Sequence, residues 1–398
     1  MNAILSGAAA ASTSAATPAP TILACGAWLK NAACLLQGDS VRWTKLHGDL
    51  DDPANCLALE QSVAALLALA EGGVDAVAHD LHPDFFSTRL AQRVAFDLAV
   101  PAIAVQHHHA HVAAVLAEHR WQAPVIGLAL DGVGLGSDGA AWGGELLLVD
   151  PTRRREPEGW RRLGHLHSLA LPGGDVAARQ PWRMAASALH ALERGDEIVP
   201  RFGADVGFLA ARTVQTMLAR NIHCPPTSSA GRWFDAAAGA LGICRAQQGE
   251  AEAAIALEQM ALEYLALEYL AQPGPGMEVN HYALHADGRL DLRSLLAVLF
   301  ALADGGDQQQ IRRGAALFHL TLVDALAHWA SQAADLHGID TVALGGGCFL
   351  NRIVKERLSA ELARRGLRVL SPQINSCGDA GLALGQAWVA RTRYVAVR

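Results

Sequence analysis

Residues 124–150 read PVIGLALDGVGLGSDGAAWGGELLLVD: an apolar run, a turn rich in glycine and aspartate, and a second apolar run. Apolar runs of this length between turn residues are typical of buried strands, so the stretch predicts a β-hairpin. Residues 21–50, TILACGAWLKNAACLLQGDSVRWTKLHGDL, predict an opening meander of three strands. Because the second unit echoes the first, we expect a duplicated fold of two lobes.

Helices are expected to alternate with strands after the opening meander. Residues 53–73 have helical spacing of apolar residues, 74–82 predict a short buried strand, and 87–100 predict a second helix capped by Ser87 or Thr88. This alternation implies a mixed sheet with crossover connections. Near the other end, residues 339–351 and 367–387 each run from a strand through a loop into a helix, which indicates ligands gathered at strand ends.

We therefore expect an α/β chain with three parts. Residues 1–18 predict a disordered tail, 19–121 a first α/β lobe, and 122–398 a second α/β lobe. The second lobe is expected to hold a helical insertion at about 181–336.

Composition excludes several classes of protein. A length of 398 residues is enough for two large cores. With 51% apolar and 18% charged residues, the chain is too hydrophobic to be disordered. The net charge of -7 and the lack of a long basic run argue against a nucleic-acid binder. No apolar run reaches membrane-spanning length. Because the seven cysteines never form C-x-x-C, a reducing, cytoplasmic location is expected.

The strongest local signal is VQHHHAHVAAVLAEH, residues 105–119. His107 and His111 are four residues apart, so on a helix both imidazoles share one face and can chelate one metal ion. A solvated, histidine-rich helix start is the alternative. His108 and His109 point elsewhere on the same turn and are weaker candidates.

Two more ligands are expected from carboxylates at strand ends. Asp131 follows the apolar run 125–130 and opens a loop with four glycines, and Asp379 lies in SCGDAG at a helix start. Taken singly, each aspartate also fits a turn or an N-cap. Only convergence with the histidines favours a metal site.

Several loops have the residues expected of a nucleotide site. Glycines between a strand and a helix, or in a turn, allow close approach of the backbone to a phosphate. Asp235 has the alternative of a first-turn position in its helix, and Lys30 that of a solvated turn lysine. The candidates in these loops are Lys30, Gly132, Gly134, Gly231, Asp235, Gly346 and Gly347.

Eight motifs in this order resemble one known family, the C-terminal carbamoyltransferase domain of the hydrogenase-maturation protein HypF. The resemblance runs from about residue 20 to the end. The motifs are GAWLKN with HGDL, HDLHPDFFSTRLA, QHHHAH, DGVGLGSDGAAWGGE, LPGGDVAARQPWRMA, SAGRWFD, GGGCFLNR and GDAGLALGQA.

The resemblance implies two duplicated α/β lobes of the sugar kinase, Hsp70 and actin type, related to tRNA threonylcarbamoyl transferases and antibiotic O-carbamoyltransferases. It implies one iron or zinc ion held by His107, His111, Asp131 and Asp379. Lys30 matches a lysine expected at the adenylate phosphate and joins His107, His111 and Asp131 as a catalytic candidate. The loop with Gly346, Gly347 and Asn351, and the Phe-Asp motif at Asp235, are expected to face adenosine.

The implied function is transfer of a carbamoyl group from carbamoyl-adenylate to the C-terminal cysteine of a HypE-like partner, with AMP released, on the way to the cyanide ligands of a nickel-iron hydrogenase. ATP is expected as the related nucleotide. Two alternatives remain: O-carbamoylation of a small-molecule hydroxyl, and a nucleotide-binding regulatory subunit without turnover. Full-length members carry upstream domains with C-x-x-C motifs that form carbamoyl-adenylate. We expect only the final transfer step from residues 1–398.

Overall fold

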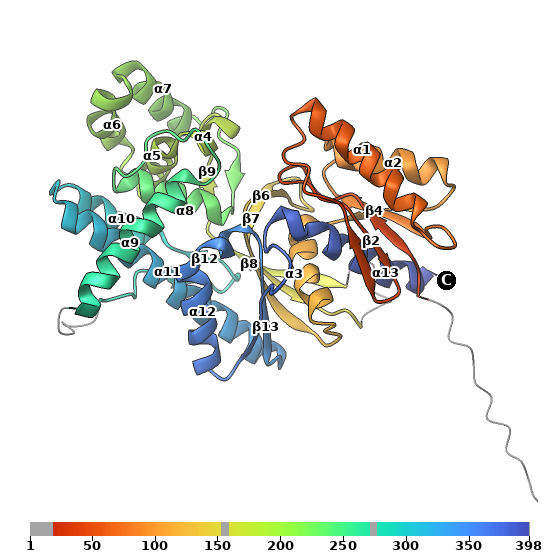
Figure 1. The fold of residues 1–398 in the computed structure, drawn as a ribbon. Coiled ribbons are helices and arrows are strands. Elements are labelled where there is room, and N and C mark those ends of the chain that lie inside the picture. Colours follow the sequence, from red (N-terminus) through yellow and green to blue (C-terminus); the bar gives the residue numbers. More distant parts are fainter. Residues whose placement is uncertain (1–18, 153–158, 271–276, 398) are drawn as a thin grey trace, which may run out of the picture.

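The computed structural model describes residues 19–152, 159–270 and 277–397 (Figure 1). The predicted tail at 1–18 lies outside these residues. None of the helices in the described ranges has both the length and the apolar character needed to cross a bilayer. The cytoplasmic location stays a prediction.

The first sheet contains the opening meander. Its strands run in the order β3-β2-β1-β4-β5, with β1, β2 and β3 antiparallel and β1, β4 and β5 parallel. The parallel strands need crossover connections, which helices α1 and α2 supply. The bounds are β1 Ile22–Ala24, β2 Cys34–Gln37, β3 Ser40–Trp43, α1 Pro53–Ala68, β4 Ala76–Asp80, α2 Phe86–Asp97 and β5 Ala102–Val105.

The second sheet repeats this arrangement. Strand β6 pairs antiparallel with β7, β7 pairs antiparallel with β8, and β6, β13 and β14 are parallel, which gives the order β8-β7-β6-β13-β14. Two short strands, β10 and β9, extend the β7 side. The bounds are β6 Val125–Leu135, β7 Ala141–Val149, β8 Trp160–His165, β9 Leu169–Ala170, β10 Pro226–Thr227, β13 Thr341–Gly345 and β14 Arg368–Leu370.

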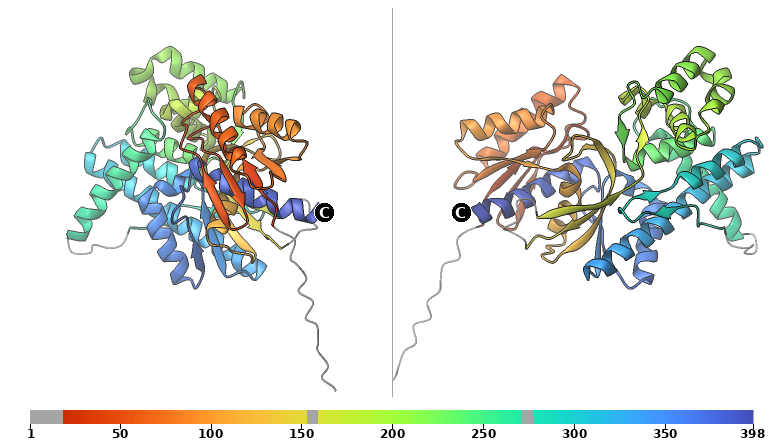
Figure 2. Two further views of the ribbon diagram at one scale, coloured as in Figure 1. Left: turned by 45° about the vertical axis from the view of Figure 1, so that its right-hand side comes forward. Right: turned by 180° about the vertical axis from the view of Figure 1, so that it is seen from behind.

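The two equivalent strand orders confirm the predicted duplicated α/β fold of the sugar kinase, Hsp70 and actin type. The additional helical region lies between β8 and β13 and forms the green and cyan part of the molecule, away from the first sheet (Figures 1 and 2). Its elements are α4 Asp175–Arg179, α5 Pro181–Ala191, η1 Gly195–Glu197, α6 Ile198–Val206, α7 Phe208–Ala219, α8 Ala230–Ala240, α9 Glu252–Leu270, β11 Ala283–Leu284, β12 Leu290–Asp291, α10 Arg293–Ala303 and α11 Gln308–His337.

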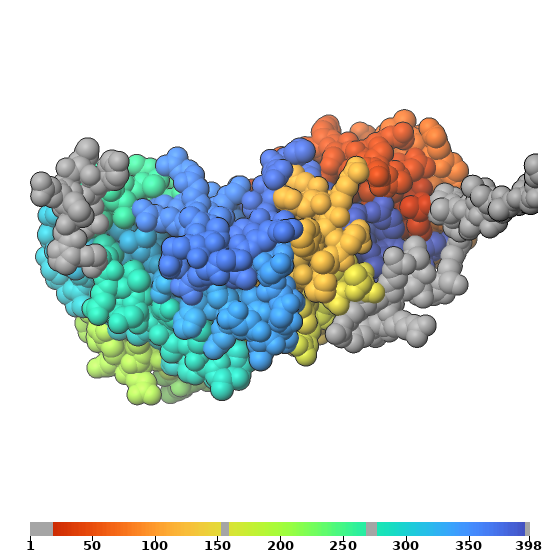
Figure 3. Space-filling view, turned by 90° about the horizontal axis from the view of Figure 1, so that it is seen from below, coloured from red at the N-terminus to blue at the C-terminus, as the bar shows by residue number. Residues whose placement is uncertain are grey.

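Two helices pass between the lobes. Helix α3 (His107–Glu118) follows β5 of the first sheet but packs on β6 and β13 of the second. Helix α13 (Leu382–Val397) follows η3 (Asp379–Gly381) and packs on β1, β2 and β4 of the first sheet and on α3. The division of the chain at about residue 121 remains our proposal for the lobes. Figure 3 shows the orange surface of the region around residues 90–120, the region that contains α3, directly beside the blue C-terminal quarter of the chain.

Strand alternation explains how the first sheet is covered on both faces. Leu23 and Leu35 pack against α1 and α2, whereas Ile22 and Leu36 pack on the opposite face against α13. Adjacent residues of a strand point to opposite faces, so an apolar run without polar breaks suits a sheet buried on both sides. The alanines of α13 let this helix approach the sheet closely.

One local prediction is wrong. Helix α2 begins at Phe86 with Phe85 at the cap position and no side-chain capping bond, so Ser87 and Thr88 lie inside the helix. The Thr88 hydroxyl instead donates to the carbonyl of Asp80 at the end of β4 (3.2 Å). A tertiary contact therefore uses the side chain that the sequence suggested as a cap.

Candidate functional site

Helix α3 begins at the first histidine of the pair. Gln106 is its N-cap: the Gln106 side-chain oxygen accepts from the His109 backbone N–H (2.8 Å), and its nitrogen donates to the Leu135 carbonyl on β6 (3.1 Å). The cap thus fixes where the helix starts relative to the second sheet. His107 and His111 lie one turn apart on one face, with ring centroids 4.8 Å apart.

Asp131 lies where the β6–β7 ladder is interrupted. The register shifts between Leu130 and Gly134, so Asp131 sits in a β-bulge, a feature that redirects a side chain. Its Oδ1 accepts from the Gly347 backbone N–H (3.0 Å) in the loop after β13. Asp379 opens η3, directly before α13.

These two aspartates converge on the two histidines. Nε2 of His107 is 3.3 Å from Asp131 Oδ2 and 3.5 Å from Asp379 Oδ1. Nε2 of His111 is 3.6 Å and 3.4 Å from the same two oxygens. One donor atom from each of the four residues lies within 4.8 Å of the other three. The structure therefore brings together all four predicted ligands, from α3, β6 and η3.

The spacing of these atoms fits a metal ion. Metal–ligand bonds of about 2.0–2.2 Å place neighbouring donors of a tetrahedral site roughly 3.3–3.6 Å apart. Nε2 of His111 is buried and has no hydrogen-bond partner among the described residues. Such an unpaired buried atom costs about 1–3 kcal/mol, and a bound cation removes this cost. Two imidazoles and two carboxylates suit iron or zinc.

Without a metal ion, the two histidines and two aspartates of the cluster stabilise one another's charged forms. Burial opposes charging of His107, but Asp80 and Asp379 raise its pKa well above the ordinary value. Burial also opposes charging of Asp131, yet the nearby imidazoles of His107 and His111 hold its pKa well below the usual range. Protons on the imidazoles therefore occupy the place of a cation, so metal binding must release them.

The other two histidines of the run lie outside this cluster. His108 is fully buried, and burial with the nearby His107 charge lowers its pKa well below the ordinary value. Burial lowers the pKa of His109 to about 3. Both side chains are therefore neutral near pH 7.

Lys30 extends toward the opposite lobe. Its Nζ lies 2.8 Å from Glu250 Oε2, just before α9, and its side chain is 45% exposed. The Lys30 backbone N–H donates to Asp49 Oδ1 (2.8 Å), which holds a turn with φ +43°. Burial opposes charging, but the hydrogen bond and charge of Glu250, and then the charge of Asp379, together raise the pKa of Lys30. A cation thus faces the second lobe near the four-residue cluster.

The glycine loops differ in how much space they leave. A Cβ on Gly132 would meet nothing within 4 Å, and one on Gly231 would lie 3.0 Å from the Gly132 Cα. The start of α8 therefore stacks on the Asp131 loop. A Cβ on Gly134 would lie 2.6 Å from the His107 ring, so Gly134 makes room for a histidine. This packing does not support its predicted contact with a nucleotide.

The loop after β13 is held mainly by protein contacts. A Cβ on Gly346 would lie 2.3 Å from the Leu130 carbonyl oxygen, and φ of Gly346 is +107°. Asn351 caps α12 (Arg352–Arg364) by accepting from the Val354 N–H (3.0 Å), and its amide nitrogen lies 2.9 Å from Nε2 of His319. The side chain of Asn351 is therefore already engaged on both atoms.

Asp235 lies in the second turn of α8, not in the first turn that the sequence offered as an alternative. Its Oδ2 is 2.7 Å from Arg232 Nε without hydrogen-bond alignment, and its Oδ1 accepts from Gln247 (3.1 Å). Burial raises the pKa of Asp235 to about 6, against the opposing effect of Arg232. A buried carboxylate with one unaligned oxygen suits a hydroxyl donor of a ligand.

Two side chains at the site were not found from the sequence. Asp80, at the end of β4, places Oδ2 2.7 Å from Nδ1 of His107. A carboxylate at the end of a predicted strand, within HDLHP, was the available signal. Glu250 lies in a loop, and no local pattern marks it as the partner of Lys30.

The nearby cysteines are not activated as nucleophiles. Burial, and then the charge of Asp131, raise the pKa of Cys348 well above its ordinary value, and burial raises that of Cys377. Both side chains therefore remain thiols near neutral pH, whereas the reactive form of cysteine is the thiolate.

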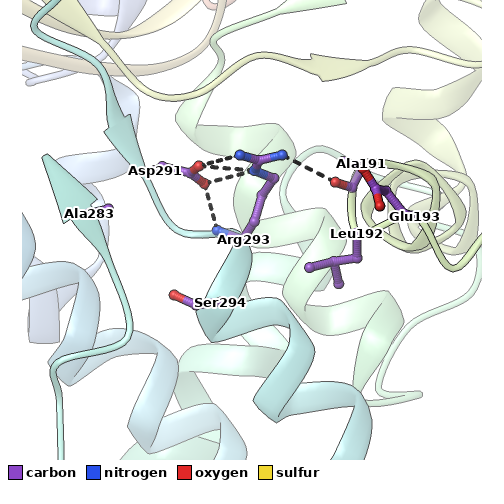
Figure 4. Close-up of a pocket in the computed structure, with 7 residues that line it drawn as sticks. All are labelled: Ala191, Leu192, Glu193, Ala283, Asp291, Arg293 and Ser294. Carbon is purple, nitrogen blue, oxygen red and sulfur yellow. Dashed lines mark hydrogen bonds and ion pairs between the residues drawn. The ribbon is translucent and has the colours of Figure 1, made fainter. Parts of the chain in front are cut away.

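A separate pocket of about 410 Å³ lies between the end of α5, the β11–β12 hairpin and the start of α10. Figure 4 shows the Arg293 guanidinium bonded to Asp291 and to the Ala191 carbonyl. Its main polar groups therefore already have partners, and none of its lining residues belongs to the four-residue cluster.

Two family models match the chain. Residues 17–118 match the HypF Kae1-like domain, and residues 127–386 match the second subdomain of the carbamoyltransferase Kae1-like domain. Both candidate metal histidines fall in the first match, and both aspartates fall in the second.

Curated relatives agree with the family models. A carbamoyltransferase HypF homolog of Cupriavidus necator is 63% identical over 93% of this chain and 91% of that protein. Carbamoyltransferase HypF2 of the same organism is 48% identical over 94% of this chain, and HypF of Rhizobium leguminosarum is 38% identical over 94%. The chain spans 47% and 45% of those two proteins, about half their length.

Solved structures show the same architecture. A full-length HypF crystallised in a phosphate- and nucleotide-bound form matches 94% of this chain and 47% of its own, with a TM-score of 0.80 and 29% identity. A HypF from T. kodakarensis matches with a TM-score of 0.81 and 28% identity.

Proposed function

The chain belongs to the HypF family of carbamoyltransferases, and we propose that its residues transfer the carbamoyl group of carbamoyl-adenylate to the C-terminal cysteine of a HypE-like maturation protein, toward the cyanide ligands of a nickel-iron hydrogenase. One observation carries this proposal. Four candidate metal ligands, three buried and one half-buried, converge between the two lobes, and Nε2 of His111 has no hydrogen-bond partner among the described residues. We assign only the transfer step to the described residues.

The proposed metal ligands are His107, His111, Asp131 and Asp379, whose donor atoms are already grouped. A bound iron or zinc ion would act as a Lewis acid toward a carbonyl or phosphate oxygen of the adenylate. The protein's contribution is to hold these ligands, and the contact between Asp131 and the Gly347 N–H helps to fix one of them.

The proposed nucleotide site surrounds this cluster. A Cβ on Gly132 would meet open space, and Gly231 at the start of α8 packs against Gly132. The exposed backbone at Gly132 suits close approach of a phosphate. Lys30 supplies a cation from the first lobe. Asp235 would accept from a ribose hydroxyl; its Oδ2 is ion-paired with Arg232 but lacks an aligned hydrogen bond among the described residues. Gly346, Gly347 and Asn351 would line the adenosine side of the proposed nucleotide site.

The proposed reaction is an attack by sulfur on a carbonyl carbon. The partner's terminal thiol gives its proton to solvent, and its sulfur forms a bond to the carbamoyl carbon. The bond between that carbon and the bridging phosphate oxygen breaks, and AMP leaves with the electron pair. Lys30 lowers the cost of charge on the departing phosphate. The nucleophile belongs to the partner, in keeping with the raised pKa values of Cys348 and Cys377.

The test is to supply preformed carbamoyl-adenylate, the metal-loaded chain and an acceptor protein that ends in cysteine. We expect one carbamoyl group on the terminal cysteine, measured by intact mass and peptide mapping, and one AMP released for each. An acceptor with the terminal cysteine replaced by alanine should remain unlabelled, although adenylate binding is unchanged. Carbamoylation of a small-molecule hydroxyl instead, or binding without any turnover, would overturn the proposal.

A further inference from the structure

Asp80 contacts the candidate metal site from the first lobe. It is the last residue of β4, is 0% exposed, and places Oδ2 2.7 Å from Nδ1 of His107. The other ring nitrogen of His107, Nε2, is the atom that faces Asp131 and Asp379. His107 thus lies between a carboxylate of the first sheet and two carboxylates on its opposite edge.

The carboxylate of Asp80 is itself held in place. Its Oδ1 accepts from the His82 backbone N–H (2.9 Å). The carbonyl of Asp80 accepts from the Thr88 hydroxyl (3.2 Å) and lies 2.7 Å from Nδ1 of His79. These contacts tie Asp80 to β4, to its following loop and to α2. The group that meets His107 is therefore rigid, which a positioning role requires.

This contact selects one form of the imidazole. A ring nitrogen that carries a proton cannot bind a metal, so a neutral histidine must have its proton on the other nitrogen. A carboxylate accepting from Nδ1 favours the proton there and leaves the Nε2 lone pair facing the cluster. Ligand histidines are commonly oriented by such a second partner, whose loss weakens metal binding.

We propose that Asp80 is a positioning residue of the metal site: by accepting a hydrogen bond from the Nδ1–H of His107, it directs the Nε2 lone pair toward Asp131 and Asp379. Through this contact the first sheet also supports a site whose ligands come from α3, β6 and η3. This inference rests on the metal site in the proposed function and adds a residue that touches neither metal nor nucleotide.

The experiment compares Asp80→Asn with Asp84→Asn in the full chain. The Asp80→Asn substitution keeps the size of the side chain but removes its charge. Asp84 lies four residues later, is mostly exposed and pairs with Arg89. Zinc alone is titrated against a chelator, and cobalt alone reports the ligand geometry through its visible absorption. For Asp80→Asn we expect the dissociation constant for zinc to rise about 10- to 100-fold and the cobalt spectrum to shift. Asp84→Asn should leave both unchanged.

A second measurement needs no substitution at Asp80. In the zinc-loaded chain, nitrogen-15 NMR should show His107 with a proton on Nδ1 and zinc on Nε2. Zinc on Nδ1 would overturn the inference even if Asp80→Asn failed to fold. A folded Asp80→Asn variant with zinc affinity and a cobalt spectrum like those of the unsubstituted chain would also overturn it.

The failure of this inference can be told from failure of the proposed metal site. If the unsubstituted chain binds zinc through His107 and His111 but does not respond to Asp80→Asn, only the role of Asp80 is lost. If replacing both histidines leaves zinc binding intact, the metal site itself is wrong.

Discussion

Replacement of His111 by glutamine separates a metal-binding role from a structural one. Nε2 of His111 lies 3.4 and 3.6 Å from two carboxylate oxygens but has no hydrogen-bond partner among the described residues. Glutamine keeps most of the side-chain volume, and its amide can donate to Asp131 or Asp379. At a pH above the folded pKa of His111, where its ring in the metal-free chain is neutral, the free energy of unfolding should therefore change by no more than about 1 kcal/mol.

The effect on metal affinity should be much larger. Loss of a residue that merely orients a ligand costs about 10- to 100-fold in affinity, so loss of one of four ligands should cost at least about 100-fold. A factor of 100 corresponds to about 2.8 kcal/mol. The assay is competition with a chelator, with metal content measured after gel filtration and thermal unfolding measured on the metal-free chain.

His108→Gln is the matched control. His108 is fully buried on the same helical turn, and its Nε2 likewise lacks a partner among the described residues, but it lies outside the four-residue cluster. This variant should keep the metal affinity within about threefold. The reasoning is refuted if both variants bind metal equally well, or if His111→Gln destabilises the metal-free chain by several kcal/mol at a pH where His111 is neutral.

Three further predictions follow from the same geometry. Lys30→Ala should weaken AMP binding about tenfold, as expected for loss of one charged contact, without changing metal content, whereas the exposed Lys45→Ala should leave AMP titrations unchanged. Gly346→Ala should lower the free energy of unfolding by more than about 2 kcal/mol, because its Cβ would lie 2.3 Å from the Leu130 carbonyl oxygen; Gly366→Ala, with φ +84° and open space, should cost less in the same denaturant experiment. In the metal-free chain the raised pKa of His107 and His111 stabilises the fold fully below pH about 6.5, and this stability is lost as the pH rises through the folded pKa values. The lowered pKa of Asp131 gives stability that is lost only in acid. The melting temperature should therefore fall when the pH is raised above neutral. The metal-loaded chain should show the opposite trend at the low end, since protons compete with the metal.

The features that the sequence predicted are those carried by local patterns. The apolar runs around Asp131 and the i,i+4 spacing of His107 and His111 are local, and both the hairpin and the shared helix face are confirmed. The eight motifs predicted which distant segments belong to one site, and the four proposed ligands do lie together.

The remaining features depend on contacts between segments far apart in the chain. Asp80 is 27 residues from His107, and Glu250 is in another lobe from Lys30, so no spacing rule pairs them. Helix α13, the last helix, packs on the first strands of the chain, and the order of elements along the sequence does not predict this contact. Thr88 resembled a cap in sequence, but its hydroxyl serves the end of β4.

The most direct test of the account is a crystal structure of the metal-loaded chain with a non-reactive adenylate analogue, with anomalous scattering recorded at the metal edge. We expect one anomalous peak about 2.0–2.2 Å from Nε2 of His107, Nε2 of His111 and the carboxylates of Asp131 and Asp379, with the analogue's phosphate beside Lys30. A metal bound elsewhere, or an adenylate bound away from this cluster, would contradict the account.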